Sequence, residues 1–377
     1  MLIYIVVFII SLWGVREADV RYEERSYRIL FSLIAVLPPI LLAGFRDSTV
    51  GTDMVIYILP LFEEQAIAQQ ELGTFIDTND LEILYLILNY IVAKITDSPF
   101  VLLLLIHTLI IIPLYITAMK WRELLSPVLF MFVFYMIFFQ ESLSIVRQSI
   151  ALSFSLLAFT VFLEKKYIEF FVYAMIAFLF HQTAVIALSI PLIYLAVDKY
   201  SIREYYLYYI GVILLVMLFF LNLDAILIWL IDGGYIDLKF LIYTSADNAF
   251  TPVLGATNFV VKIVTIAYFI FIMFLYKSDT ILKFFLIVAV LDMSFSLCAL
   301  IVQPLDRISL YYRLMTCISI PYIIYNYPII YSDDETPYTR PIEGLFCVLL
   351  FAYWFYVYML GNYDDTADYQ ISRTLFI

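Results

Sequence analysis

Several arginines in this sequence stand where an apolar helix begins, and their chemistry is the most specific signal in the chain. A cation inside a membrane helix is costly and is by default a functional position. A guanidinium group also presents a planar fork of donors, which suits a phosphate or pyrophosphate. The sequence therefore predicts an anion site in one half of a membrane. The arginines concerned are Arg46, Arg147, Arg307 and Arg313.

Candidate proton-transfer groups lie near the same apolar segments. His181 stands in the stretch Phe180-His181-Gln182-Thr183-Ala184, between two short apolar runs with no real loop. A neutral histidine can act as a general base near neutral pH. Asp53 and Glu82 also lie near segment ends and are the alternative bases. Capping and dipole contacts for the acids, and a hydrogen-bonded interfacial role for His181, are the structural alternatives.

The remaining chemistry-bearing residues have both structural and functional interpretations. Arg46 can be a flank that reaches water beside a glycine turn, and Arg147 can pair with Glu141. Tyr311 lies four residues after Arg307 and would share its helix face. His107 lies in the middle of an apolar segment, where a polar contact between helices is expected.

The composition decides where these residues must be placed. The chain of 377 residues is 64% hydrophobic and only 14% charged, which excludes a soluble enzyme, a disordered chain and a coiled coil. A net charge of −12 without a basic patch excludes a nucleic-acid partner. Two histidines, and three cysteines inside apolar runs, predict neither a metal centre nor a disulfide framework. No metal and no cofactor is expected.

Apolar segments run through the whole chain, and a helix needs about 20 apolar residues to cross a bilayer. The pattern predicts an all-α, polytopic membrane protein with about twelve transmembrane helices. We expect one membrane domain, 1–377, with outer loops at 46–80 and 223–256. The segment 1–15 lacks a basic residue before it and is expected to be a retained helix. The candidate spans are 1–15, 29–45, 81–96, 99–119, 127–139, 142–163, 168–180, 182–198, 205–222, 258–276, 281–301, 308–327 and 343–360.

Lysine and arginine in short loops predict the orientation. Four basic clusters are placed inside, which puts 46–80, Arg147, His181, Arg307 and the C-terminal tail outside. Lys120 and Arg122 then fall on the wrong side. The simplest topology that moves Lys120 and Arg122 to the inner side has 127–139 as a re-entrant or interfacial segment that does not cross the membrane. The rival topology reverses the first three spans. The four clusters are Arg16 to Arg28, Lys165 with Lys166, Lys199 with Arg203, and Lys277 with Lys283.

These residues, in this order, resemble the EpsG family of bacterial polysaccharide polymerases, relatives of the Wzy-type O-antigen polymerases. The resemblance covers residue 1 to about 325, and 223–256 carries no matching motif. Its features are Arg46 with Val50-Gly51-Thr52-Asp53 and Tyr57, then Glu82, then Arg147 with Ala151, then Phe180 to Ala184, then Arg307 to Arg313.

The resemblance implies a metal-independent glycosyltransferase at the outer face of a bacterial cytoplasmic membrane. It would polymerise oligosaccharide repeat units carried on undecaprenyl pyrophosphate into exopolysaccharide, capsule or O-antigen. Its partners would be this lipid-linked substrate, the membrane lipids, and the flippase and chain-length regulator of the same pathway. Two rival functions are a flippase for the same substrate and a glycan ligase that uses the same donor.

The resemblance also assigns roles to residues. The catalytic candidates are His181, Asp53 and Glu82. The candidates for binding pyrophosphate or glycan are Arg46, Arg147, Arg307, Arg313, Tyr57 and Tyr311.

Overall fold

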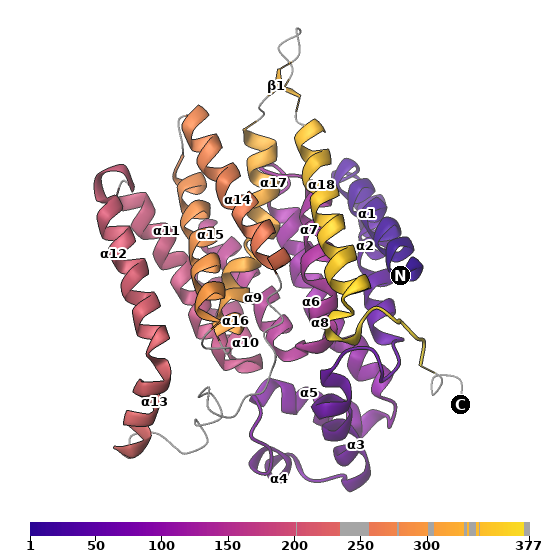
Figure 1. Cartoon of the computed structure of the whole chain (residues 1–377). Coiled ribbons are helices and arrows are strands. Elements are labelled where there is room, and N and C mark those ends of the chain that lie inside the picture. Colours follow the sequence, from indigo (N-terminus) through magenta and orange to yellow (C-terminus); the bar gives the residue numbers. More distant parts are fainter. Residues whose placement is uncertain are drawn as a thin grey trace. The chain divides into compact units, whose positions relative to one another are not determined.

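The structure is a computed structural model that describes residues 1–372 except 201, 234–255, 277–278, 301–304, 328–329, 332–336 and 339. The described residues are almost entirely helical and form two compact units (Figure 1). Unit 1 comprises Met1–Val185 and Ile320–Ile377, and unit 2 comprises Ile186–Ser319. The only described strands are β1 (Ile330–Tyr331) and β2 (Pro337–Tyr338), which pair antiparallel.

Several described helices are long and apolar enough to cross a membrane. There are six: Arg25–Gly44, Pro99–Lys120, Val146–Leu163, Gln182–Lys199, Thr280–Cys298 and Glu343–Leu360. Shorter apolar helices accompany them, and outward-facing side chains are apolar too, such as Ile168 and Phe171 on one of these helices. An exposed apolar surface of this extent requires lipid around it. The chain is therefore a polytopic membrane protein, and the count of about twelve crossings stays a prediction.

Unit 1 contains the first ten α-helices and the C-terminal helix. Proline begins α6 and α7, where its missing N–H costs nothing, and the Ser126 hydroxyl caps α7 by accepting from Leu129 N. The elements are α1 (Leu2–Val20), α2 (Arg25–Gly44), η1 (Met54–Ile58), α3 (Leu59–Ala68), α4 (Leu72–Asp77), α5 (Ile83–Ile95), α6 (Pro99–Lys120), α7 (Pro127–Ile137), α8 (Phe139–Ser144), α9 (Val146–Leu163), α10 (Tyr167–Phe180), α18 (Arg340–Trp354), η4 (Phe355–Leu360) and η5 (Tyr363–Asp365).

Contacts between turns define the two ends of unit 1. At one end, Arg122 Nε lies 3.0 Å from Asp19 Oδ1 and Lys120 Nζ lies 2.9 Å from Glu164 Oε1. We call this the basic end, because the turns after α1, α6 and α9 bring their cations there. At the other end, the backbone of Asp47 donates to Gln370 O at 2.8 Å. We call this the loop end, since it holds 46–80 and the C-terminal tail.

Helix α5 starts and finishes at the loop end, so the expected crossing at 81–96 is wrong. Its N-cap residue Glu82 forms an ion pair with Arg147 in the first turn of α9. Near its other end, Lys94 Nζ lies 3.0 Å from Gln69 Oε1, in the segment after α3. Figure 1 shows α3, α4 and α5 gathered at this end of unit 1. Since α5 returns the chain to its own side, α6 begins at the loop end and finishes at the basic end.

The course of α7 and α8 argues against the expectation that 127–139 does not cross. Helix α7 starts seven residues after Lys120 at the basic end, and α8 finishes at the loop end, where Leu143 O accepts from Arg46 at 2.8 Å. The 11 residues of α7 and the 6 of α8 together reach about 26 Å. Nearly every side chain of both helices is buried. An inner helix surrounded by protein need not match the full thickness of the lipid, so a short one suffices.

This arrangement removes the conflict over Lys120 and Arg122. With α5 held at one end and α7–α8 crossing, both residues lie with Arg16 to Arg28 and with Lys165 and Lys166. No reversal of the first three spans is needed to bring them together.

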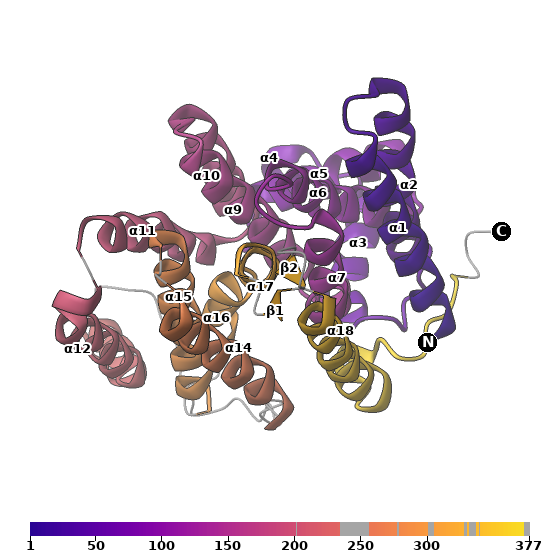
Figure 2. The same cartoon turned by 90° about the horizontal axis from the view of Figure 1, so that it is seen from above.

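Unit 2 is built around α15, which packs against α11, α12, α14 and α16. Figure 2 shows α14, α15 and α16 side by side. The ring of Phe295 stacks on Tyr312 at 5.4 Å, and the Tyr312 hydroxyl lies 2.8 Å from Ser189 Oγ. The elements are η2 (Gln182–Leu188), which begins in unit 1, α11 (Ser189–Lys199), α12 (Ile202–Leu221), α13 (Leu223–Asp232), α14 (Ala256–Leu275), α15 (Thr280–Cys298), α16 (Leu305–Arg313) and α17 (Thr316–Asn326), which ends in unit 1.

The expected outer loop 223–256 begins with the helix α13. Its residues 234–255 lie outside the described part of the chain.

Cysteine labelling tests the corrected course of the chain. In a background without the three native cysteines, single cysteines at Asp77, Glu123 and Tyr167 are treated with an impermeant thiol reagent. All three positions are exposed. Glu123 and Tyr167 should be labelled from one face of the membrane and Asp77 from the other. Labelling of Asp77 and Glu123 from the same face would contradict the crossing of α7 and α8.

Candidate functional site

Glu82 is the point at which three of the predicted segments meet. Its Oε2 forms an ion pair with Nη1 of Arg147. Its Oε1 lies 3.6 Å from Nδ1 of His181 and accepts from the backbone N of Gln182 at 3.4 Å. The three side chains are 10%, 18% and 12% exposed, so the group is mostly shielded from water. The N-cap of α5, the first turn of α9 and the C-cap of α10 thus form one site.

Two tyrosines flank the guanidinium group of Arg147. Its central carbon lies 4.9 Å from the ring centre of Tyr57 and 5.8 Å from that of Tyr85. The two rings meet edge to face at 6.4 Å. Burial, followed by the charge of Asp53 at the N-cap of η1, raises the pKa of Tyr57 well above its usual value. Tyr57 therefore keeps its proton and can act as a donor. Tyr57 joins the site as expected, and Tyr85 is an addition to it.

Arg147 combines burial with unused donor capacity. One guanidinium nitrogen is engaged by Glu82, while Nε is buried and has no hydrogen-bond partner among the described residues. A buried donor without an acceptor costs free energy, and an incoming oxyanion would relieve that cost. No group of three His, Cys, Asp or Glu side chains within the described ranges could hold a metal ion.

The contacts of His181 identify its neutral tautomer. Its Nδ1 accepts from the backbone N–H of Thr183 at 3.3 Å and lies 3.0 Å from the Thr183 hydroxyl. A backbone N–H can only donate, so Nδ1 is the unprotonated nitrogen of the neutral ring. The proton then sits on Nε2. In this state the ring offers a donor at Nε2 and uses its basic nitrogen within the turn.

The conformation of Gly51 holds the loop before η1 against the start of α9. Gly51 has φ +98°, and a Cβ there would lie 2.6 Å from Leu143 O. Only glycine tolerates both the left-handed backbone and this approach. The next residue, Thr52, donates its backbone N–H to Ser144 Oγ at 3.1 Å. The motif around Gly51 therefore fixes the residues just before Arg147.

Arg46 lies in a separate contact group and is only 1% exposed. Its Nη1 donates to Ala43 O at 2.8 Å and lies 3.3 Å from Nε2 of His107. Its Nη2 donates to Leu143 O at 2.8 Å and to the sulfur of Met54 at 3.4 Å. His107 donates from Nδ1 to Leu103 O, so its Nε2 accepts from Arg46. His107 thus makes the expected contact between helices.

The C-terminal tail belongs to the same end of unit 1 and was not singled out by the sequence. Its Ser372 donates its backbone N–H to Phe45 O at 2.9 Å, and the Tyr369 hydroxyl donates to Leu42 O at 2.7 Å. Near the N-terminus, the Tyr4 hydroxyl donates to Thr366 O at 2.8 Å. Backbone pairing of this kind leaves no periodic signature in a sequence.

The third predicted arginine group lies in unit 2, on α16. Arg307 is exposed, whereas Tyr311 and Arg313 are 2% and 5% exposed. Arg307 and Tyr311 are four residues apart but lie in different surroundings. Arg46, Glu82, Arg147 and His181 are all in unit 1, so each group is described within its own unit.

Unit 2 also contains a buried ion pair that the sequence analysis missed. Lys262 of α14 places Nζ 2.6 Å from Asp292 Oδ1 of α15 and also donates to the hydroxyl of Ser296. The two charged side chains are 6% and 5% exposed. The signal was available, because each is a lone charge within an apolar segment.

The pair is expected to hold α14 against α15. Lys262→Met leaves Asp292 as a buried charge without its partner, which should lower the free energy of unfolding by about 3–5 kcal/mol. The double variant Lys262→Met, Asp292→Leu should recover most of this loss. Unfolding of the purified protein in mixed micelles measures both, with Lys283→Met as the control on α15. A single variant as stable as the parent would rule out this role.

Comparison with known proteins gives one match. The family model described as the EpsG family matches residues 29–371, which is most of the chain. No curated protein and no solved structure matches it. The matched range includes Arg46, Arg147, Glu82, His181, all of unit 2 and the tail up to Ile371. The chain therefore belongs to the EpsG family.

Proposed function

We propose that this protein is a membrane glycosyltransferase that polymerises lipid-linked oligosaccharide repeat units into a surface polysaccharide. Its donor is a glycan on undecaprenyl pyrophosphate. The observation that carries the proposal is the Arg147 centre, where a mostly buried guanidinium group lies beside a carboxylate and a histidine, and its Nε has no partner among the described residues. Membership of a family associated with polysaccharide polymerases supports the same reaction.

The reaction needs positive charge at the leaving group and a base at the acceptor. The acceptor hydroxyl oxygen bonds to the anomeric carbon of the donor, and the bond from that carbon to the pyrophosphate oxygen breaks. The bonding electrons leave with the lipid pyrophosphate, and Arg147 stabilises the charge that grows there. Tyr57 donates a hydrogen bond to the same group. Arginine supplies this stabilisation through fixed donors.

Glu82 is the base that this geometry favours. The hydroxyl proton of the acceptor must pass to an unprotonated oxygen or nitrogen within hydrogen-bond reach. In the part of the chain that the structure describes, the contacts of Glu82 Oε1 are long, at 3.4 Å and 3.6 Å. His181 uses Nδ1 to accept from Thr183, so we assign it a donor role through Nε2–H. Asp53 is the alternative base, since it lies at the start of the helix that carries Tyr57.

The site faces the outside of the bacterial cytoplasmic membrane in this proposal. The basic end of unit 1 carries Arg16 to Arg28, Lys120, Arg122, Lys165 and Lys166, and the positive-inside rule places such short loops in the cytoplasm. The loop end, with Glu82 and Arg147, is then outside. The flippase and the chain-length regulator of the pathway are the expected partners. Arg307, Arg313 and Tyr311 of unit 2 are proposed to contact the same lipid-linked substrate.

Analysis of the surface glycan in a deletion strain tests the function. A polymerase predicts that a ladder of chain lengths is reduced to one repeat unit. Loss of all surface glycan would indicate a flippase. An intact polymer that is not attached to its carrier would indicate a ligase.

Arg147 provides the test of the anion site. Arg147→Ala should reduce polymer formation by about 10²–10³-fold while the protein level stays normal, because fixed charge stabilisation of the leaving group is lost. Arg147→Lys should rescue poorly, since a point charge cannot replace the planar fork. Arg16→Ala, at the basic end, is the control and should behave like the parent. Full activity of Arg147→Ala would exclude this role.

His181 and Glu82 are separated by kinetics with a lipid-linked donor and the purified protein. Glu82→Gln removes the proposed base and should lower kcat by about 10²–10⁴-fold. The amide of His181→Gln keeps an N–H donor at about the position of Nε2, so this variant should retain far more activity than His181→Ala. If His181→Gln and His181→Ala are equally impaired while Glu82→Gln is active, His181 is the base.

A further inference from the structure

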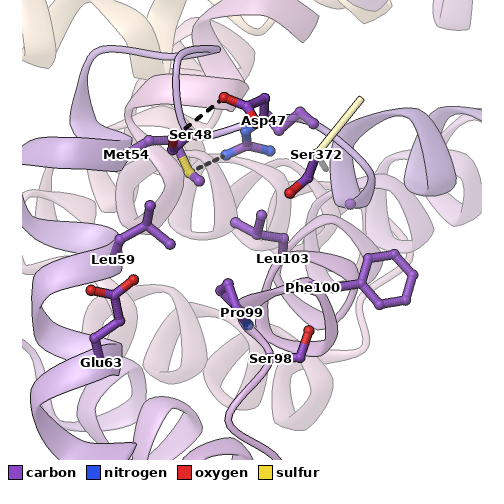
Figure 3. Close-up of a pocket in the computed structure, with 12 residues that line it drawn as sticks. Asp47, Ser48, Met54, Leu59, Glu63, Ser98, Pro99, Phe100, Leu103 and Ser372 are labelled. Atoms are coloured by element: carbon purple, nitrogen blue, oxygen red, sulfur yellow. Dashed lines mark hydrogen bonds between the residues drawn. The ribbon is translucent and has the colours of Figure 1, made fainter. Parts of the chain in front are cut away.

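A pocket lies beside Arg46 at the loop end of unit 1. It has a volume of about 140 Å³ and is lined by residues of η1, α3, the start of α6 and the C-terminal tail. Figure 3 shows Leu59 and Glu63 of α3 on one side and Pro99, Phe100 and Leu103 of α6 on the other. A cavity of about 150 Å³ accommodates a six-membered ring, so this pocket has room for one sugar ring.

The lining is acidic and rich in hydroxyl groups. Asp47 and Glu63 contribute carboxylates, and Ser48, Ser98 and Ser372 contribute hydroxyls. Asp47 Oδ1 accepts from Thr49 N and from the Ser48 hydroxyl within its own turn, at 3.2 Å and 3.3 Å. Two carboxylates and one guanidinium group give the lining a net negative charge, which disfavours binding of a phosphate. The same groups suit the hydroxyls of a neutral sugar, with apolar walls for its ring faces.

Arg46 lines this pocket and has little left for an anion. Both Nη atoms are engaged by the carbonyl groups of Ala43 and Leu143, by His107 and by Met54. Only Nε is without a hydrogen-bond partner in the described part of the chain, and it is buried. A single N–H cannot clamp a pyrophosphate with a bidentate fork. Arg46 therefore forms part of the pocket wall and is no pyrophosphate clamp.

Burial lowers the pKa of Arg46 to about 10, which still keeps its charge at neutral pH. The Nε–H donor is therefore present under physiological conditions.

We propose that this pocket binds one neutral sugar residue of the glycan, as a subsite separate from the pyrophosphate site at Arg147. This inference rests on the proposed function, since it takes the glycan of that reaction as the ligand. The two sites are adjacent, because Met54 contacts Arg46 and Tyr57 contacts Arg147 from the same short helix. One glycan chain can reach both.

Binding of a lipid-free glycan tests the subsite. The probe is the oligosaccharide that mild acid releases from the lipid-linked repeat unit of cells lacking this protein. Calorimetry with the full chain in nanodiscs gives the affinity. Glu63→Gln should weaken binding about tenfold or more, because a hydrogen bond to a charged acceptor becomes a bond to a neutral one. Glu64→Gln is the matched control, because Glu64 is exposed on the same helix and does not line the pocket.

Ser98→Phe fills the pocket and should abolish binding. Its thermal midpoint in the same nanodiscs checks the fold. Inorganic pyrophosphate should not compete with the oligosaccharide for the pocket. The Arg147→Ala variant should bind the oligosaccharide with the affinity of the parent protein. The subsite is overturned if the parent does not bind the probe, if Glu63→Gln and Ser98→Phe bind it as the parent does, or if pyrophosphate displaces it.

These outcomes are independent of the deletion strain. A strain that keeps its full polymer ladder would refute the proposed function, whereas probe binding that depends on Glu63 would still support a sugar pocket. Conversely, the deletion strain could lose its polymer ladder while Glu63→Gln binds the probe as tightly as the parent protein. That pair of results would refute the subsite and leave the proposed function standing.

Discussion

A charged side chain that leaves water must find partners inside the protein, and this constraint organises the structure. Arg147 reaches Glu82 from another helix, and Lys262 reaches Asp292. Arg46 reaches carbonyl groups before and after it in the chain, including Leu143 O. The contacts with Glu82, Asp292 and Leu143 O join different elements of the chain. Helix positions that would otherwise be set only by apolar packing are therefore fixed by polar contacts at a few points.

The ion pair at Glu82 also explains why α5 does not cross. Its N-cap must remain beside the first turn of α9, and its other end is held near Gln69 by Lys94. An apolar sequence of 13 residues then lies at one end of the unit, where protein covers much of it. The chain instead runs from one end of unit 1 to the other through α7 and α8, whose side chains are nearly all buried by neighbouring helices. Length and hydropathy alone assign these two segments the opposite way.

Composition and charge predicted the fold class, and the residues Glu82, Arg147, His181 and Tyr57 were predicted for the site. Arg147 was marked by its charge inside an apolar helix, Glu82 and His181 by their places at segment ends, and Tyr57 by the family resemblance. The sequence did not predict which arginine contacts backbone carbonyl groups and which forms an ion pair. Arg46 and Arg147 look alike in sequence, and only their acceptors distinguish them. The C-terminal tail was missed because its contacts are backbone hydrogen bonds. Lys262 was missed although its isolation in an apolar run marked it.

Arg46 and Arg147 of unit 1 have different partners, and the proposed roles of the two arginines differ for this reason. Arg46 uses its two Nη atoms for two backbone carbonyl groups and two side chains, and it lines an acidic pocket. Arg147 makes one ion pair and stands between tyrosine rings with Nε unpaired. A polymerase must hold neutral sugars and a pyrophosphate at the same time, and these need opposite electrostatic surroundings. Met54 and Tyr57 of one short helix contact Arg46 and Arg147, so the two different surroundings lie next to each other.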